Sequence, residues 1–383
     1  MTYLLKLGEL TLKGGNRGEF EKVLKRNLRA LLKGATAKIS VTNGRYFVDV
    51  PEEHAEQAER AFFRLFGITG WALTQVSDKT VDAVIDACIE EAHILERKNI
   101  KTFKIEARRA DKSFPLDSYG IMASAGRAVL ENVPALKVNI KMPEAVISVE
   151  IREKAYVYSN SVKGLRGLPV GTAGRGLLLL SGGIDSPVAG FLMAGRGMGI
   201  DAVHFHAYPF TSDEARQKVA KLAEILGGYT MGVRLHIIRF TDIQTRIKEC
   251  APFPWTTVLL RMAMMKAAEN TARRCGAKCI ITGESLSQVA SQTVENIACT
   301  QSLISMTVFR PLIGMDKESI VRIAEKIGTY KTSILPYEDC CMLFSPEHPI
   351  LRGDVKEALT LFEKLDIDGL IKRSIEERVM YRL

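Results

Sequence analysis

The stretch Gly174–Gly197, GRGLLLLSGGIDSPVAGFLMAGRG, combines an apolar strand, a turn of small residues and a helix. Its four consecutive leucines, 177–180, are typical of a strand that is buried on both faces. Pro187 suits the first turn of a helix, where its missing N–H leaves no hydrogen bond unmade. We therefore expect a strand–turn–helix unit at the start of a C-terminal domain.

Three further apolar segments follow this unit, with amphipathic stretches of helical period between them. They are DAVHFHAY (201–208), RLHIIRF (234–240) and KCIITGES (278–285). The alternation predicts a doubly wound, parallel α/β sheet over residues 176–383. Ligands bind such sheets beyond the carboxyl ends of the strands, so the polar residues that end these segments are candidate site residues.

The turn after the first strand has the composition of an anion site. Gly182 and Gly183 allow backbone N–H groups to converge because no Cβ blocks the approach. Ser181 and Ser186 add hydroxyl groups, and the N-terminus of the following helix adds a positive dipole. The alternative is a tight glycine turn that holds no ligand.

The turn also lacks two well-known nucleotide motifs. No lysine follows it as in a Walker A loop, and the G-x-G-x-x-G pattern is absent. The site is therefore expected to bind the pyrophosphate of ATP without transferring the γ-phosphate. Asp185 would then orient Mg²⁺ or the loop itself. This combination predicts ATP and Mg²⁺ as cofactors, in a reaction that releases pyrophosphate and transfers AMP.

Composition limits the class of protein. The chain of 383 residues has a net charge of +9, and residues 1–50 hold ten Lys and Arg against four Asp and Glu. A basic N-terminal module suggests a polyanionic partner, although a solvated basic helix is the alternative. No run of about 18 apolar residues is present, which excludes a membrane-spanning helix. The cysteines form no disulfide framework, so we predict a reduced, cytoplasmic protein.

Two α+β modules are expected before the parallel sheet. Residues 1–52 have a strand–helix–strand–strand order, with a hairpin signal at Asn43-Gly44. Residues 53–163 follow with helices and strands, the last of which is predicted as one long strand over 145–159. Residues 164–175 are rich in glycine and basic, which is typical of a linker.

Several segments resemble one enzyme family. The motif SGGIDS (181–186) resembles the PP-loop of the ATP pyrophosphatase superfamily, and the longer string 167–193 resembles the tRNA 4-thiouridine synthetases of the ThiI family. Other segments resemble that family's N-terminal ferredoxin-like domain, its THUMP RNA-binding domain and its later catalytic motifs, in order: KLGELTLKGGNRGEFEKVL (6–24), IEARRADKSFPLDSYGI (105–121), ITGESLSQVASQT (281–293), RPLIGMDKESI (310–320) and TSILPYEDCCMLFSP (332–346).

The resemblance implies an ATP-dependent tRNA sulfurtransferase. Such an enzyme adenylylates O4 of uridine 8 in tRNA, and a cysteine persulfide then displaces AMP to give 4-thiouridine. The route is chemically reasonable because a uracil carbonyl oxygen is a poor leaving group and AMP is a good one. The family is also linked to sulfur transfer for the thiazole ring of thiamine.

Site residues are assigned partly from the residue types and partly from the resemblance. His204 and Phe205 would flank the adenine, with a packed Phe and a hydrogen-bonded His as the alternative. Arg261 lies in an apolar helix and needs an anionic partner, unless it lies on the helix surface. The full set expected to bind the nucleotide is Leu179, Leu180, Ser181, Gly182, Gly183, Asp185, Ser186, His204, Phe205, Arg261, Gly283 and Gln292.

Four residues are expected to act in catalysis: Asp185, Lys317, Cys340 and Cys341. The resemblance matches Lys317 to a family lysine, and we expect its ammonium to stabilise charge that develops on the phosphates. It matches Cys340 to the sulfur carrier, and Cys341 is the adjacent residue that would resolve the persulfide. Cys275 and Cys279 are separated by three intervening residues on an expected helix, and no zinc spacing appears. The sequence does not decide whether an iron–sulfur cluster is present.

RNA phosphates would be bound by basic side chains of both N-terminal modules. These are Lys13, Arg17, Lys22, Lys25, Arg26 and Arg29 in the first module and Arg108, Arg109, Lys112 and Lys163 in the second.

The chain ends at Leu383, after a stretch 369–383 that we expect to be helical. We therefore expect a short form without the rhodanese-like domain that some relatives carry. Sulfur would then come from a separate cysteine desulfurase, and a role in thiamine synthesis is in doubt. The oligomeric state is open, with a homodimer as one option.

Other functions remain open from sequence alone. They are a PP-loop ligase or amidotransferase acting on a small molecule, another PP-loop enzyme that modifies tRNA, a THUMP-containing RNA methyltransferase and a non-catalytic RNA-binding protein.

Overall fold

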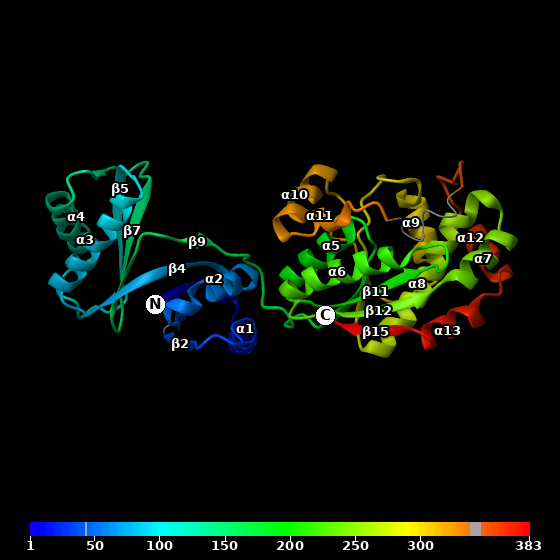
Figure 1. Ribbon diagram of the computed structural model, residues 1–383, viewed down its shortest axis with the longest axis horizontal. Coiled ribbons are helices and arrows are strands. Elements are labelled where there is room, and N and C mark those ends of the chain that lie inside the picture. Colours follow the sequence, from blue (N-terminus) through cyan, green and yellow to red (C-terminus); the bar gives the residue numbers. More distant parts are fainter. Residues whose placement is uncertain (43, 338–345) are drawn as a thin grey trace. The chain divides into compact units, whose positions relative to one another are not determined.

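The computed structural model describes residues 1–42, 44–337 and 346–383. It divides into two compact units, Met1–Glu21 with Leu28–Gly167 and Lys22–Asn27 with Leu168–Leu383. Figure 1 labels their helices and strands. The fold class expected from the sequence, a parallel α/β domain preceded by two α+β modules, is confirmed.

The first module is an antiparallel sheet in the strand order β2-β3-β1-β4, with two helices. Its elements are β1 (Thr2–Leu7), α1 (Arg17–Leu31), β2 (Lys38–Thr42), β3 (Arg45–Asp49), α2 (Ala55–Arg64) and β4 (Ile68–Ser77). This is the ferredoxin-like order of strand–helix–strand repeated twice. The hairpin is confirmed by the pairing of Thr42 with Arg45. Since β4 pairs with β1, the boundary expected at residue 52 falls inside this module.

The second module continues the same sheet, because the end of β4 pairs with β8. Helices α3 and α4 bury their apolar sides against β5 and β7 in one core. The elements are α3 (Val81–Arg97), β5 (Thr102–Arg109), α4 (Ser118–Asn132), β6 (Lys137–Val138), β7 (Ala145–Ile151), β8 (Ala155–Tyr158) and β9 (Val162–Lys163).

The single strand predicted over residues 145–159 is wrong. The chain turns at the polar residues 152–154, and β7 and β8 pair with each other as an antiparallel hairpin. The apolar alternation has the same phase before and after these three residues, so it does not distinguish one long strand from two paired strands.

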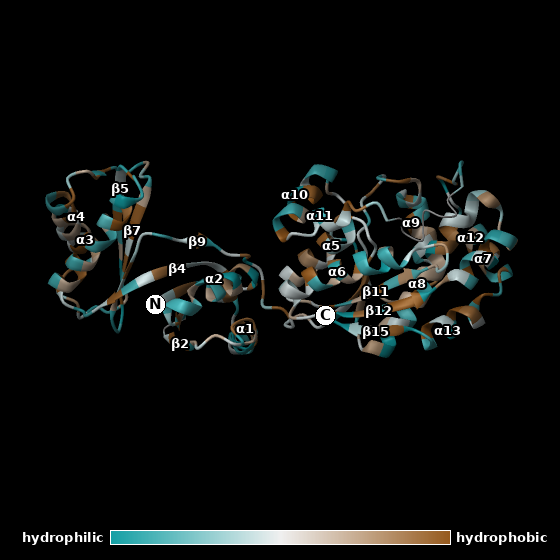
Figure 2. Ribbon diagram, in the orientation of Figure 1, coloured by the Kyte–Doolittle hydropathy of each residue, from teal (hydrophilic) through white to brown (hydrophobic). Residues whose placement is uncertain are grey.

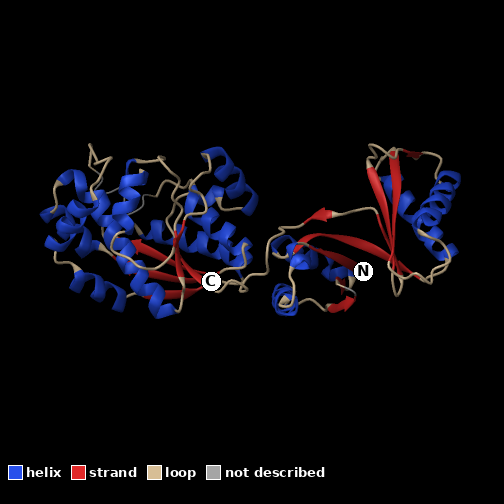
Figure 3. Cartoon of the chain, turned by 180° about the vertical axis from the view of Figure 1, so that it is seen from behind, coloured by secondary structure: helices blue, strands red, loops and turns tan. Residues whose placement is uncertain are grey.

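The second unit contains a six-stranded sheet in the order β14-β13-β10-β11-β12-β15. Figure 3 shows helices packed around these strands. The strands are β10 (Arg175–Leu179), β11 (Gly199–His206), β12 (Arg234–Arg239), β13 (Cys279–Ile281), β14 (Val308–Phe309) and β15 (Val379–Arg382). The helices are α5 (Asp185–Gly195), α6 (Asp213–Thr230), α7 (Thr241–Cys250), α8 (Thr256–Cys275), α9 (Val294–Gln301), α10 (Lys317–Ile327), α11 (Tyr330–Ser333), α12 (Val355–Lys364) and α13 (Asp368–Glu376).

Both faces of this sheet are covered, as the continuous leucines of β10 require. Leu177 is buried in the core that α8 forms on one face. Leu178 faces the other way, where the absent side chain of Gly190 in α5 leaves room for Leu178 and for Leu226 of α6. In Figure 2 the strands β11 and β12 are accordingly rich in hydrophobic residues. No helix in the described part of the chain is long and apolar enough to cross a membrane.

The strand order creates a switch point beside β10. From β10 the chain passes to β11 and β12 on one side, and then returns to β13 and β14 on the other. Strands β10 to β14 are parallel, so the turn after β10 meets the segment after β13 at the carboxyl edge. This is where a ligand is expected.

Two local expectations are corrected here. The stretch 369–383 is not a single helix, because α13 ends at Glu376 and β15 pairs antiparallel with β12. Cys275 and Cys279 do not share a helix, since the first ends α8 and the second begins β13.

Candidate active site

The turn between β10 and α5 is held by its two serines. The N–H of Ser181 donates to Ser186 Oγ at 3.0 Å, and the two hydroxyl oxygens lie 3.1 Å apart. The N–H of Gly183 donates to Ser181 Oγ at 3.2 Å. The serine side chains therefore fix the shape of the loop ahead of the helix N-terminus, where the axial dipole favours an anion.

Gly283 allows the end of β13 to approach this turn. A Cβ at Gly283 would lie 2.8 Å from the backbone nitrogen of Ser186 and 2.9 Å from the carbonyl carbon of Asp185. Neither atom can move without displacing the start of α5. A side chain is therefore excluded at this position, and the residue sets the distance between the two sides of the switch point.

Asp185 and Lys317, both expected to act in catalysis, are in contact. The ammonium of Lys317, at the start of α10, donates to Asp185 Oδ1 at 2.6 Å. The amide of Gln288 donates to Asp185 Oδ2 at 2.8 Å. Gln288 was not expected from the sequence, because a polar residue in a short loop carries no pattern of its own.

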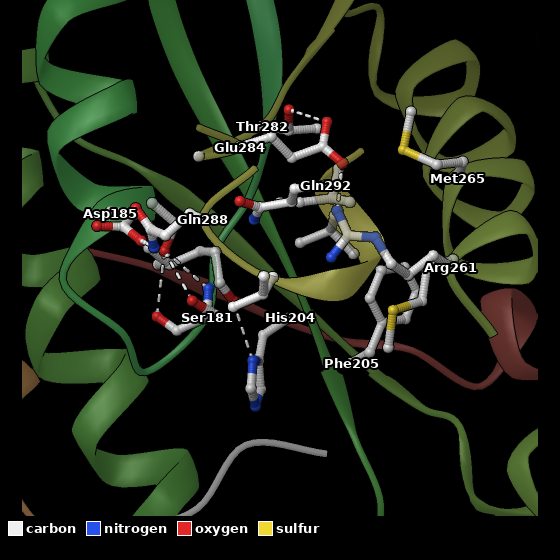
Figure 4. A pocket seen from close by; sticks show the side chains of 17 residues that line it. Ser181, Asp185, His204, Phe205, Arg261, Met265, Thr282, Glu284, Gln288 and Gln292 are labelled. Carbon is white, nitrogen blue, oxygen red and sulfur yellow. Dashed lines mark hydrogen bonds and ion pairs between the residues drawn. The ribbon is translucent and has the colours of Figure 1, made fainter. Parts of the chain in front are cut away.

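A cavity of about 360 Å³ opens beside the turn. In Figure 4, Asp185 and Gln288 lie on one side of it, and Arg261 and Phe205 lie on the other. Most of the residues expected to bind the nucleotide line this cavity: Leu179, Leu180, Ser181, Asp185, Ser186, His204, Phe205, Arg261, Gly283 and Gln292. Gly182 and Gly183 belong to the turn but are not among the described lining residues. Their roles, and those of the lining residues, stay predictions.

Arg261 has the anionic partner that its apolar helix requires. One of its terminal nitrogens is in contact with Glu284 Oε1. Glu284 Oε2 accepts hydrogen bonds from Arg310 Nε at 2.7 Å and from Thr282 Oγ1 at 2.8 Å. Burial raises the pKa of the Glu284 carboxyl. The positive charges of Arg261 and Arg310 lower it by more than burial raises it, so the net shift of the pKa is downward. Glu284 is therefore an ionised, buried carboxylate at the cavity.

Glu284 was among the polar residues expected at the strand ends but was assigned no role, and Arg310 was not expected from the sequence. The available signal was the position of Glu284, directly after the strand end and Gly283. Nothing in the local pattern connects Arg310 with that site.

His204 and Phe205 also have partners within the protein. His204 Nδ1 lies 3.0 Å from the carbonyl oxygen of Leu180, and the ring is buried. The ring of Phe205 packs on Phe240 with 4.6 Å between centroids. Both contacts are those expected if the two residues serve only as a hydrogen-bonded His and a packed Phe. Because both residues also line the cavity, a role beside the adenine stays a prediction.

Three family models match the chain. The ThiI ferredoxin-like domain matches residues 2–72, and the THUMP domain matches residues 78–160. The third, described as "Thiamine biosynthesis protein (ThiI)", matches residues 171–367. The chain belongs to the ThiI family. The end of the ferredoxin-like match at residue 72 agrees with the place of β4 in the first module.

Curated relatives of this ThiI chain are similar over their whole length. The probable tRNA sulfurtransferase of Treponema pallidum is 47% identical over 384 residues, which cover 100% of this chain and 96% of the relative. That of Caldanaerobacter subterraneus is 44% identical and covers 98% of each chain.

Solved structures agree with the fold of the ThiI chain. A 4-thiouridine synthetase in complex with RNA and with bound ATP has a TM-score of 0.92 at 34% identity, covering 100% of this chain and 99% of that one. A protein of Pyrococcus horikoshii has a TM-score of 0.67 at 25% identity, covering 85% of this chain and 99% of that one.

The two cysteines expected to act in sulfur transfer in this ThiI chain, Cys340 as the carrier and Cys341 as the resolving residue, lie outside the described residues. Burial raises the pKa of Cys88 to about 12, with a further contribution from Glu91, and burial alone raises that of Cys279 to about 11. Neither is therefore a thiolate near neutral pH.

Over residues 1–42, 44–337 and 346–383, no three His, Cys, Asp or Glu side chains form a group that could hold a metal ion.

The basic residues expected to bind RNA differ in their surroundings. Arg17 forms an ion pair with Glu21 at 2.7 Å, and the ammonium of Lys13 lies 5.0 Å from the centre of the Phe20 ring. Arg109 Nη1 donates to the carbonyl oxygens of three loop residues, including Phe114 at 3.1 Å. Exposed side chains are Lys22, Arg26, Arg29, Arg108, Lys112 and Lys163, and Lys25 is half-buried. Phosphate contacts by these residues stay predictions.

Proposed function

We propose that the cavity beside the SGGIDS turn binds ATP, and that the protein uses it as a tRNA sulfurtransferase. The enzyme adenylylates O4 of uridine 8 in tRNA and then transfers persulfide sulfur to give 4-thiouridine. The observation that best supports the proposal is that three features lie together at the carboxyl edge of the sheet. They are the SGGIDS turn, the Asp185–Lys317 ion pair and Arg261. The family and the similarity to a 4-thiouridine synthetase bound to RNA and ATP support it.

The chemistry follows from the shape of the turn. Its N–H groups and the N-terminus of α5 offer hydrogen bonds and a positive dipole to the phosphates. No lysine follows the turn to hold a γ-phosphate for transfer. Pyrophosphate is thus well placed as the leaving group, and the AMP that is retained on O4 makes that oxygen displaceable by sulfur.

Asp185 fits a role beside Mg²⁺. Sites for this ion usually combine one or two carboxylates with the phosphates of the substrate, and Asp185 is a partly exposed carboxylate that lines the cavity. Mg²⁺ would supply charge neutralisation on the phosphates. Lys317 and Gln288 hold the carboxylate of Asp185, and so fix its position at the mouth of the turn.

We assign RNA binding to residues 1–163, residues 164–175 to a linker, and the chemistry to residues 176–383. The ferredoxin-like and THUMP matches and the basic surface of α1 support this division. Cys340 is the proposed sulfur carrier, with a separate cysteine desulfurase as the donor. Because the substrate is tRNA, we place the reaction in the cytoplasm, and a homodimer stays a prediction.

One experiment tests the proposal directly. The purified protein is incubated with tRNA, ATP, Mg²⁺ and a persulfide donor, and the tRNA nucleosides are then analysed by mass spectrometry. We expect 4-thiouridine at position 8 and pyrophosphate release that depends on tRNA. Release of pyrophosphate without tRNA, in the presence of a small-molecule acceptor, would instead favour a PP-loop ligase.

A further inference from the structure

Glu284 connects three segments of the second unit at the edge of the cavity. Its side chain is 4% exposed and lies just beyond β13. It contacts Arg261 of α8 through one carboxylate oxygen, and Arg310, which follows β14, through the other. Thr282 adds a hydroxyl hydrogen bond. One buried carboxylate is therefore shared by two guanidinium groups.

The three charged groups of this cluster do not cancel. Two guanidinium groups and one carboxylate leave a net charge of +1. On the opposite side of the cavity, Asp185 and Lys317 form a neutral pair. A surplus charge in a buried site is costly unless an opposite charge approaches it. The cluster thus favours an anionic ligand over a neutral one.

The two arginines have different positions in the cluster. Arg261 lines the cavity, whereas Arg310 is not among the described lining residues. Arg310 is held from behind by Gln301 Oε1, at 2.9 Å from its Nη1. Each arginine also has one buried nitrogen, Arg261 Nε and Arg310 Nη2, that has no hydrogen-bond partner among the described residues. What distinguishes the two is therefore their position: Arg261 lines the cavity with Glu284, and Arg310 contacts Glu284 without being among the described lining residues.

Removal of Arg310 would change the balance of charge. Glu284 and Arg261 alone would form a neutral pair, and the attraction for an anion would fall. With Arg310 present, Glu284 holds Arg261 in place without cancelling the positive charge of the site. The same effect is not available from Thr282, which supplies a hydrogen bond but no charge.

We propose that Glu284 and Arg310 are positioning residues of the nucleotide site: Glu284 fixes the guanidinium of Arg261, and Arg310 offsets the charge of Glu284, so that the cavity keeps a net charge of +1 toward the phosphates of ATP. This inference rests on the proposed function, in which the cavity binds ATP. It makes the discrimination between charged and uncharged nucleotide ligands depend on a residue outside the cavity.

The test compares ATP with adenosine, which offers the same base and sugar without phosphates. Binding of each is measured by calorimetry at constant salt, first with the wild-type protein. We expect Arg310→Met to weaken ATP binding about tenfold and to change adenosine binding by less than about twofold. Arg310→Lys, which keeps the charge, should bind ATP within about threefold of wild type.

The double variant Glu284→Gln/Arg310→Met removes one negative and one positive charge together, while the amide oxygen of the introduced glutamine can still accept a hydrogen bond from Arg261 and hold it in place. Arg261 then again supplies a net charge of +1, so ATP binding should recover to within about threefold of wild type. A purely structural role predicts the reverse, since the loss of two partners would weaken the site more than the loss of one. ATP binding by the double variant as weak as that of Arg310→Met would overturn the proposal, as would an equal loss for ATP and adenosine.

The chain offers a matched control at the other end of the sheet. Buried Asp201 accepts hydrogen bonds from Arg175 Nη1 at 2.7 Å and Arg234 Nε at 3.0 Å, which is the same arrangement of one carboxylate and two arginines. Arg175→Met should leave the affinity for ATP unchanged, because this cluster lies at the amino ends of β10 and β12. Wild-type protein that fails to bind ATP would sink the proposed function itself, whereas binding with no difference between the variants would sink only this inference.

Discussion

Lys317 Nζ lies 2.6 Å from Asp185 Oδ1, although the two residues stand 132 positions apart in the chain. The lysine begins α10 and the aspartate begins α5. The side chains are 47% and 19% exposed, and ion pairs this accessible to water contribute at most about 1 kcal/mol to stability. The contact therefore matters for the site more than for the fold, and substitutions here test chemistry without unfolding the domain.

Asp185→Ala should abolish tRNA-dependent release of pyrophosphate and leave tRNA binding unchanged. The carboxylate is the proposed partner of Mg²⁺ and of Lys317, while the proposed RNA surface lies on other elements. Pyrophosphate release and a tRNA binding isotherm measure the two effects separately. Glu318→Ala, a neighbouring carboxylate that is 83% exposed, serves as control. Wild-type rates in Asp185→Ala would remove the residue from the mechanism.

Cys340→Ser should still activate tRNA yet fail to insert sulfur. A hydroxyl cannot carry persulfide sulfur, but the ATP site does not need the thiol. Pyrophosphate release and 4-thiouridine content are measured on the same samples, with Cys250→Ser as the control because Cys250 is an exposed free thiol. If Cys341→Ser shows this split and Cys340→Ser does not, the roles of the pair are exchanged.

The parallel sheet was predictable because its central strands β10, β11 and β12 are largely buried on both faces and thus consist mostly of apolar residues. Leu177–Leu180 and the SGG turn suffice to predict β10 and the start of α5, and the parallel direction of the strands follows from their alternation with helices. The hairpin of β7 and β8 was missed because the turn is marked only by Arg152, Glu153 and Lys154, without glycine, proline or asparagine, and the alternation resumes in the same phase after it. The edge strand β15 was missed because its four exposed residues pair with β12, far away in the sequence.

The candidate site was predictable where the backbone imposes a residue type. Gly283 and the serines of the turn are such cases, since contacts within a few ångströms fix them. Gln288 and Arg310 were missed because their partners, Asp185 and Glu284, lie more than 25 positions away in sequence. A single chain carries no local signal for a charge that acts through another residue.

Gly283→Ala should disturb the turn itself. The new Cβ would meet the backbone of Ser186 at 2.8 Å, and overpacking of this kind typically costs about 1–3 kcal/mol. We expect a lower free energy of unfolding in urea and weaker ATP binding. Within the described residues, no atom lies within 4 Å of a Cβ placed at Gly314, so Gly314→Ala is the control. Unchanged stability and ATP affinity in Gly283→Ala would show that the segment after β13 can move away from the start of α5 without a cost in free energy.

Replacement of Lys25, Arg26 and Arg29 by Gln should weaken tRNA binding and flatten its dependence on salt. Each phosphate contact that is lost lowers the slope of log affinity against log salt by about one unit. Titrations at several salt concentrations measure the slope. Arg60 on α2 already forms an ion pair with Glu56. The control variant Arg60→Gln should therefore leave the salt slope unchanged. An unchanged slope in the triple variant would move the RNA surface elsewhere.

His236 should make the second unit lose stability as the pH falls. Its imidazole is buried in β12 and, among the described residues, neither ring nitrogen has a hydrogen-bond partner. Burial, followed by the charge of Arg378, lowers its pKa below the usual 6.5. Arg234 lowers it further, whereas Asp201 raises it.

The unfolded chain therefore binds a proton at this histidine more readily than the folded chain does. The free energy of unfolding thus has its full value above pH 6.5 and decreases as the pH drops toward the lower pKa of the folded state. Urea unfolding of wild type and His236→Met between pH 8 and 5 should show a shallower loss in the variant, whereas His93→Gln, at an exposed site, should follow wild type. Parallel curves for wild type and His236→Met would exclude His236 as the group responsible.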